Sequence, residues 1–363
     1  MKIGLISKFG AADGLCVRSQ HVLNGLVTLG HEVHAFTQVT DVPNLPDSHV
    51  HTFPAVQVNP HFWLDSPRVG KMIADECKRN EIDVLHIQMN SSTTEFLLPI
   101  FKHFLPPIVV TFHLAYADGN PLIRTFFEFA WKVSVMACKV YDRVVLVDPS
   151  QKSIFTRLGV SEEKLTVVPN GVDTRLFIPN TNSKPNERVE FVYVGRLSVE
   201  KGIHVLLKAF RKYHKYNPYS RLTLVGEGIL KHIFQKSYDG DSVRWLGQID
   251  HSKVPKVLQN ADVFVLPQSI GGLGLSVMEA MSCGLPVITT KIGETANLLS
   301  SEEGILVEPD DDDAIYNAMK MLGEDEALRR SMGVKCRQKI ESKYSWTTQV
   351  RLLEDIYANL LNQ

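Results

Sequence analysis

The sequence predicts two α/β domains, each a parallel sheet with helices on both faces, arranged around a central cleft. Two observations predict this doubly wound fold. Short apolar runs alternate with longer segments of helical spacing in both halves of the chain. The length of 363 residues also exceeds the usual size of one compact domain. Ligands of such sheets bind outside the carboxyl ends of the strands, so we expect the functional site in the cleft.

The first half of the chain carries five strand-like runs. They read KIGLIS (2–7), EVHAFT (32–37), DVLHIQ (83–88), PIVVTFH (107–113) and DRVVLVD (142–148). A segment of helical spacing, 19–29, separates the first two runs. This alternation is typical of a Rossmann-like parallel sheet, so we assign residues 1–177 to an amino-terminal domain.

The second half repeats the pattern. Its strand-like runs read VEFVYVGR (189–196), RLTLVG (221–226), VRWLG (243–247), ADVFVLP (261–267) and PVITT (286–290). We assign 189–345 to a second Rossmann-like domain, with helices expected at 203–213 and 252–259. The polar, Pro- and Asn-rich stretch 178–188 is the predicted linker. The last helical segment, within 346–363, has no following strand to join and is a candidate to pack back on the first domain.

Composition excludes several classes of protein. The formal net charge is −1 with 44% hydrophobic residues, and the cations are not massed in one region, which argues against a nucleic-acid binder. No apolar run reaches the roughly 18 residues that span a bilayer, and the first strand begins too early for a signal peptide. Five scattered cysteines indicate reduced thiols. We therefore expect a cytoplasmic protein.

The segment 121–143 combines aromatic residues with Lys and Arg. Such a helix could lie on an anionic membrane surface, giving a peripheral contact and a lipid-linked acceptor. The same residues could equally form a buried core helix with a solvated flank. We favour the core helix, because apolar residues nearly encircle the segment.

The most informative stretch is 267–290, PQSIGGLGLSVMEAMSCGLPVITT, a glycine-rich loop between two strand-like runs. Its glycines allow a close backbone approach, and the amides at the following helix start can point at an anion. We expect phosphate binding here, with a hydroxyl of the same ligand in reach of Glu279 one turn into the helix. The alternative is an ordinary glycine-rich turn inside a βαβ core. The predicted ligand-binding residues are Gly271, Gly272, Gly274, Leu275, Ser276 and Val277 through their backbone, and Glu279 through its side chain.

A second motif, YVGRLSVEKG at 193–202, follows the first strand of the second domain. Arg196 and Lys201 lie beyond the strand, where they could converge on one pyrophosphate, Arg as a planar fork and Lys as a point charge. The alternative is a solvated loop in which Glu200 pairs with these cations. Together with the glycine-rich loop, the set suits a nucleoside diphosphate with its ribose.

Two features of the first domain face the expected cleft. His113 ends a strand, where a histidine is as often structural as functional. The loop FGAADGL at 9–15 follows the first strand, and its Gly10 and Gly14 would let phosphates come close. This loop lacks the pattern G-x-G-x-x-G, which counts against an NAD enzyme.

The run PDDDDAI at 309–315 could be taken for a metal site. A helix start explains it better, with Asp310 as the N-cap and acidic residues in the first turn, where the helix dipole favours them. We therefore predict no metal site.

These motifs resemble the retaining glycosyltransferases of family 4, which have the GT-B fold. The resemblance rests on YVGRLSVEKG, LVGEG, VRWLG, ADVFVLP and GGLGLSVMEAMSCGLPVI in this order, with weaker matches at GHEV (30–33), TFH (111–113) and VPNGVD (168–173). It implies transfer of a sugar from a UDP- or GDP-sugar to an acceptor hydroxyl, with no metal and no cofactor. It also implies that Arg196 and Lys201 neutralise the leaving diphosphate, that Glu279 binds the ribose and that His113 contacts the transferred sugar. The acceptor is unspecified, with a glycan or a lipid-linked molecule as the candidates.

The sequence departs from the family at one position. The family has two glutamates with seven residues between them, and Gly271 stands where the first would lie. We expect diphosphate binding to be intact without this glutamate, whereas recognition of the sugar is in question. Ser269, Gln268 or the loop amides are neutral groups that could replace the missing carboxylate. Two alternative functions follow: a nucleotide-sugar 2-epimerase of similar architecture, or a catalytically silent nucleotide-sugar-binding subunit.

Overall fold

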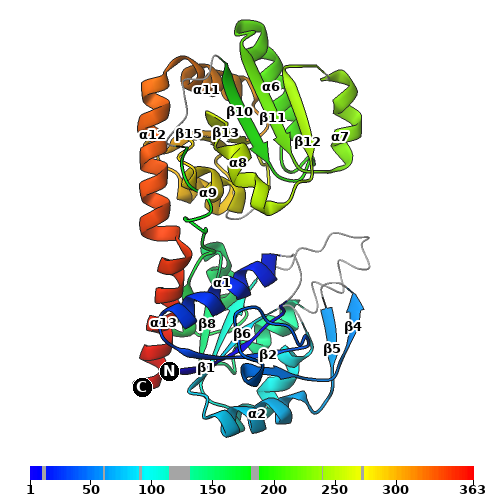
Figure 1. Ribbon diagram of the computed structural model, residues 1–363, viewed down its shortest axis with the longest axis vertical. Coiled ribbons are helices and arrows are strands. Elements are labelled where there is room, and N and C mark those ends of the chain that lie inside the picture. Colours follow the sequence, from blue (N-terminus) through cyan, green and yellow to red (C-terminus); the bar gives the residue numbers. More distant parts are fainter. Residues whose placement is uncertain are drawn as a thin grey trace. The chain divides into compact units, whose positions relative to one another are not determined.

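The computed structural model describes residues 1–9, 14–59, 62–89, 92–113, 131–180, 188–238, 240–270 and 274–363 (Figure 1). The chain divides into two compact units. The first unit is Met1–Gly171 together with Trp346–Gln363, and the second unit is Val172–Ser345. Both chain termini therefore belong to the first unit.

The first unit is built on a parallel sheet of seven strands in the spatial order β3-β2-β1-β6-β7-β8-β9. All five predicted runs are strands of this sheet. Two further strands of three residues each and an antiparallel hairpin were not predicted, because such short runs show too little alternation to detect. The strands are β1 (Lys2–Ile6), β2 (Glu32–Thr37), β3 (Val50–Thr52), β6 (Val84–Gln88), β7 (Ile108–Phe112), β8 (Arg143–Leu146) and β9 (Leu165–Val167), with the hairpin β4 (Ala55–Asn59) and β5 (Phe62–Asp65).

Successive side chains of these strands enter two apolar layers on opposite faces of the sheet. Leu85 and Ile87 of β6 join the layer that includes residues of α2, whereas Val84 joins the layer of α1 and α13. Helix α13 packs against α1 through a buried face that includes Leu353. The helices of the described part of this unit include α1 (Gly14–Thr28), α2 (Val69–Asn80), α3 (Thr94–Leu97), α5 (Lys152–Arg157) and α13 (Trp346–Leu361), and its 3₁₀ turns include η1 (Asp47–His49).

The second unit contains a parallel sheet of six strands in the order β12-β11-β10-β13-β14-β15. All five predicted runs are again strands, and β15 is the one that was not predicted. The strands are β10 (Val189–Val194), β11 (Ser220–Val225), β12 (Val243–Gly247), β13 (Val263–Leu266), β14 (Val287–Thr290) and β15 (Gly304–Val307). The helices are α6 (Ile203–Tyr216), α7 (Ile229–Phe234), α8 (Val254–Leu258), α9 (Leu275–Ser282), α10 (Gly293–Leu298), α11 (Asp312–Glu324) and α12 (Glu326–Lys339), with the 3₁₀ turn η6 (His251–Lys253) and the π-helical turn η7 (Ile340–Tyr344).

In each sheet the first strand of the unit lies inside, and the strand order reverses next to it. β1 pairs in parallel with β2 and β6, and β10 pairs in parallel with β11 and β13. This is the order of a doubly wound, Rossmann-like sheet, in which ligands bind beyond the carboxyl ends of the strands at the point of reversal. The predicted fold class is confirmed.

The boundary between the units lies at Gly171 and Val172, six residues before the predicted end of the first domain. Val172 donates its amide to the carbonyl oxygen of Tyr344 at 2.8 Å, and Phe177 is buried in the core of the second unit. Residues 178–180 belong to the predicted linker but also contact the second unit. The side chain of Gln259 donates to the carbonyl oxygen of Ile178 at 2.9 Å. Residues 181–187 lie outside the described residues.

The aspartate run is a helix start, but its N-cap is not the predicted one. The side chain of Asp311 accepts the amide of Ala314 at 2.8 Å, while Asp310 has a φ of +59° and precedes the cap. Asp312 and Asp313 pair with Lys212 of α6. The N-cap is therefore one residue later than predicted. The run has the expected role, because one aspartate caps the helix and others place negative charge at its amino end.

The described part of the segment 121–143 packs into the core. The ring of Trp131 meets those of Phe112 and Phe155 edge to face, with centroids 6.0 and 6.3 Å apart. Among the helices of the described residues, none is long and apolar enough to cross a membrane.

Candidate active site

The loop 195–202, here called the cation loop, connects β10 to α6 and carries Arg196 and Lys201. It is held against the end of β13 by Gly202, which has a φ of +69°. A Cβ at Gly202 would lie 1.9 Å from the carbonyl oxygen of Pro267, so only glycine fits there. The amide of Ser269 also donates to the carbonyl oxygen of Glu200 at 2.9 Å. The cation loop and the chain after β13 are therefore joined through their backbones.

Lys201 is held at this junction by a chain of hydrogen bonds. Its Nζ donates to Oε1 of Gln268 at 2.9 Å, and Nε2 of the fully buried Gln268 donates to Oγ1 of Thr295 at 3.1 Å. The same hydroxyl accepts the amide of Gly274 at 3.1 Å. The ammonium group is thus linked to the residue that precedes α9. Burial lowers the pKa of Lys201, and Arg196 adds to this while Glu200 opposes it.

Arg196 lies on the exposed side of the cation loop. Its carbonyl oxygen accepts the hydroxyl of the buried Tyr193 at 2.6 Å, so the backbone is anchored while the guanidinium faces outward. Glu200 accepts the hydroxyl of Ser198 at 2.6 Å. The loop therefore carries one cation anchored in the protein and one on its surface.

The amino end of α9 differs in part from the prediction. Gly274 is the N-cap, and its carbonyl oxygen accepts the amide of Val277 at 3.1 Å. The Val277 amide is therefore used inside the helix and is not open to a ligand. Leu275 and Ser276 occupy the first positions of the helix, where amides have no intrahelical acceptor. Gly271 and Gly272 lie outside the described residues.

Glu279 is buried in α9 and has a partner that the sequence did not indicate. Its Oε1 lies 2.7 Å from Nε2 of His251, a residue of η6 that also contacts the ring of Phe177. The bond to Glu279 raises the pKa of His251, against the effect of partial burial. Since η6 comes 28 residues before Glu279, no local pattern marks this pair.

His113 follows β7 in the first unit and leads a buried polar network. Its Nε2 donates to Oε1 of Gln88 at 2.9 Å, and Gln88 contacts His86, whose Nδ1 lies 2.5 Å from the hydroxyl of Tyr357. Burial lowers the pKa of His113 well below its usual value, and the cation of Arg18 adds to this effect. His113 is therefore neutral near pH 7 and fixed through one ring nitrogen.

Arg18 is a functional candidate that sequence reasoning missed. Its side chain is 2% exposed, and one Nη donates to Oδ1 of Asn170 at 2.6 Å. Nε and the other Nη have no hydrogen-bond partner. Burial lowers the pKa of Arg18 to about 10, so it is still a cation near pH 7. A buried unpaired donor costs about 1–3 kcal/mol, which is the condition of a group that awaits an anion. Of the two glycines predicted beside it, Gly14 begins α1 and Gly10 lies outside the described residues.

Two family models together match nearly the whole chain. The model described as Glycosyltransferase Family 4 matches residues 13–176, and the model Glycosyl transferases group 1 matches residues 174–339. The chain belongs to glycosyltransferase family 4. It is therefore an enzyme that transfers sugars, as the resemblance implied.

Relatives of this glycosyltransferase act on several substrates. It is 29% identical over 303 residues to the UDP-Gal:alpha-D-GlcNAc-diphosphoundecaprenol alpha-1,3-galactosyltransferase of Escherichia coli, covering 78% of this chain and 77% of that protein. It is 26% identical over 375 residues to the sulfoquinovosyl transferase SQD2 of Arabidopsis thaliana, covering 95% and 71%. The sucrose-phosphate synthase of Thermosynechococcus elongatus superposes with a TM-score of 0.75 at 24% identity, covering 99% of both chains. The last of these shows the fold alone. The family models and the two named transferases do not support an epimerase or a silent binding subunit.

The pair of Glu279 and His251 predicts a pH dependence. Because the folded state raises the pKa of His251 above its ordinary 6.5, the pair stabilises the fold fully below that value and loses its effect as the pH rises through the folded pKa. We expect an NMR titration of His251 to give a pKa above 6.5, and Glu279→Gln to lower it. An unchanged pKa in Glu279→Gln would contradict the pairing.

Proposed function

We propose that this glycosyltransferase uses a nucleoside-diphosphate sugar and retains the anomeric configuration of the transferred sugar. The observation that carries the proposal is Lys201, held by Gln268 and Thr295 next to the amino end of α9. A fixed cation beside two open helix amides, those of Leu275 and Ser276, is an arrangement that binds a diphosphate. Arg196 supplies a second, exposed cation on the same loop.

The reaction would be a front-face substitution. The bond between the anomeric carbon and the diphosphate oxygen breaks, and Lys201, Arg196 and the helix amides stabilise the charge that develops on the diphosphate. The acceptor hydroxyl attacks the anomeric carbon from the same face. Its proton passes to the departing phosphate oxygen, so no separate general base is required. The neutral His113 would donate or accept a hydrogen bond with the sugar.

We propose that transfer needs neither a metal ion nor a cofactor, because two cations and a helix amino end supply the positive charge that a divalent ion would supply. Chelators would then leave the transfer rate unchanged. We also propose that the protein is cytoplasmic and makes a peripheral contact with the membrane surface.

For the acceptor, we propose a hydroxyl on a lipid-linked molecule. Support comes from the names of relatives: the Escherichia coli enzyme named above acts on a diphosphoundecaprenol sugar, and a phosphatidyl-myo-inositol mannosyltransferase of Mycolicibacterium smegmatis is 25% identical over 98% of this chain and 93% of that protein. Both acceptors carry phosphate. The buried cation Arg18, with two unpaired donors, is the group of the first unit that such a phosphate would contact.

The experiment that tests the donor is a hydrolysis screen of the purified protein against UDP- and GDP-sugars. We expect slow release of sugar from one nucleotide class, because water can replace an absent acceptor. An NMR spectrum taken early in the reaction would show the released sugar in the donor's anomeric configuration. Binding of a nucleoside diphosphate without any sugar release, with or without lipid acceptors, would support a silent subunit instead.

Removal of either cation, Lys201 or Arg196, is expected to lower the rate of sugar transfer. Lys201→Ala and Arg196→Ala should each lower kcat for transfer by ~10²-fold or more, since each removes charge from the leaving diphosphate. Lys208→Ala, on the exposed side of α6, is the matched control and should keep the wild-type rate. Wild-type rates in both loop variants would overturn the assignment of the diphosphate site.

We expect replacement of Arg18 to affect stability and activity differently. Arg18→Met removes a buried cation with two unpaired donors, so the free energy of unfolding should stay the same or rise. Loss of one charged hydrogen bond to the substrate, about 1.5–3 kcal/mol, should lower kcat/KM by ~10–100-fold. Urea unfolding and the transfer assay measure the two quantities, with the exposed Arg157→Met as control. A less stable variant with full activity would show that Arg18 is structural.

A further inference from the structure

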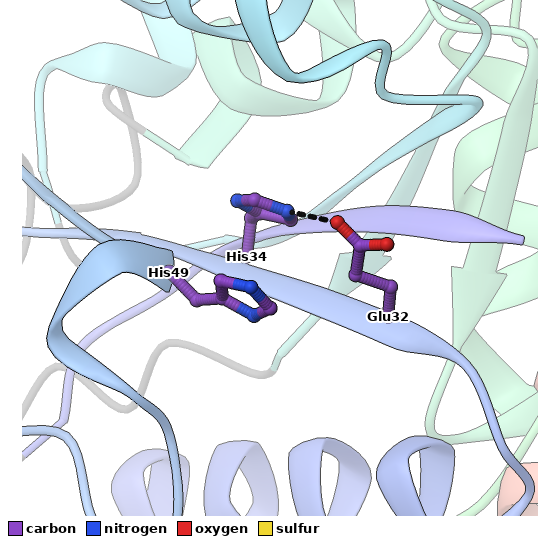
Figure 2. A group of neighbouring side chains, drawn as sticks. All are labelled: Glu32, His34 and His49. Atoms are coloured by element: carbon purple, nitrogen blue, oxygen red, sulfur yellow. Dashed lines mark hydrogen bonds and ion pairs between the residues drawn. The ribbon is translucent and has the colours of Figure 1, made fainter.

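Outside the predicted site, the first unit contains a cluster of imidazole and carboxylate groups. Glu32 and His34 lie on β2, and His49 ends η1; one ligand atom from each lies within 4.8 Å of the other two. Figure 2 shows the three side chains close together, with Nε2 of His34 bonded to Oε1 of Glu32 at 3.0 Å. The three residues lie at most 17 positions apart in the sequence.

We propose that Glu32, His34 and His49 form a binding site for a divalent transition-metal ion, with Zn²⁺ as the best fit. Two imidazoles and one carboxylate are a donor set that suits zinc and its neighbours in the first row, and it leaves a fourth position for water. Mg²⁺ and Ca²⁺ prefer oxygen ligands alone and fit this set poorly.

The surrounding hydrogen bonds orient both rings for this role. Nδ1 of His34 lies 2.9 Å from Nε2 of His51, and Nδ1 of His51 lies 3.4 Å from Oε2 of Glu76. Nδ1 of His49 lies 3.2 Å from the carbonyl oxygen of Val33. In both proposed ligands Nδ1 is thus occupied, which leaves Nε2 for a metal. Behind His49 the support is a backbone carbonyl, and behind His34 it is the ring of His51, which in turn faces the carboxylate of Glu76.

The site is reachable, and binding needs a side-chain motion. The side chain of Glu32 is 42% exposed, and His49 is half-buried. The rings of His34 and His49 are stacked, with centroids 4.3 Å apart and planes at 18°. His49 must tilt to bring Nε2 into the same coordination sphere as His34, which is easy because its χ2 angle is soft.

This position separates the site from the sugar transfer. Glu32 begins β2, whereas His113 follows the carboxyl end of β7 in the same parallel sheet. The length of β2 from Glu32 to Thr37 is about 16 Å. An ion at Glu32 would therefore stabilise the edge of the sheet formed by β2 and β3 and would lie away from His113.

The test is zinc titration of the full chain after removal of metal by a chelator. We expect calorimetry to show one Zn²⁺ bound per chain, a Tm that rises with zinc concentration, and no effect of Mg²⁺. Co²⁺ should give visible absorption bands of a low-coordinate imidazole site. His49→Gln and Glu32→Gln, both at solvent-accessible positions, should weaken Zn²⁺ binding by ~10-fold or more, as should the outer-support variant Glu76→Gln.

The exposed His103→Gln is the matched control and should bind Zn²⁺ like the wild type. No binding of Zn²⁺ by the wild-type chain would overturn the proposal, as would equal affinity in His49→Gln and the wild type. Equal competition by Mg²⁺ would also overturn it, since that result indicates attraction by surface charge alone. Circular dichroism of each variant shows that a lost site is not a lost fold.

Discussion

The candidate site of the second unit depends on the contact between Gly202 and the carbonyl oxygen of Pro267. No other residue fits there, because a Cβ would lie 1.9 Å from that oxygen and the backbone has a positive φ. The contact brings the cation loop onto the end of β13, which places Lys201 within 2.9 Å of Gln268. A substitution at Gly202 would thus displace Lys201 without touching any ligand.

The first unit depends on a different feature, a network of hydrogen-bonded polar side chains inside an apolar layer. His86, Tyr357 and Arg18 are each 2% exposed or less. Burial lowers the pKa of His86 to about 3, so it is bonded to the Tyr357 hydroxyl as a neutral ring. This bond ties β6 to α13, and the network leads through Gln88 to His113. The orientation of His113 therefore depends on the helix at the far end of the sequence.

The sequence alone predicted the parts of the site that lie in one segment. Arg196, Lys201 and Glu279 follow strands or begin a helix, and parallel strands end at one edge of a sheet, so their domain could be predicted from apolar runs. Thr295 and His251 could not be predicted, because their partners lie 21–28 residues away and no spacing rule joins them. The role of Arg18 could not be predicted either, because the sequence does not distinguish a buried guanidinium from an exposed cation of an amphipathic helix.

The absence of a carboxylate at position 271 now has a physical consequence for sugar recognition. Gln268, a neutral candidate to replace it, has both amide atoms engaged, Oε1 by Lys201 and Nε2 by Thr295, and is fully buried. Turning Gln268 toward a sugar would break both bonds and release Lys201 from the start of α9. The same side chain cannot position the cation and read the sugar. On the proposed function, contacts to the sugar hydroxyls would then come from Ser269 or from loop amides, while the cations proposed to attract the diphosphate are unchanged.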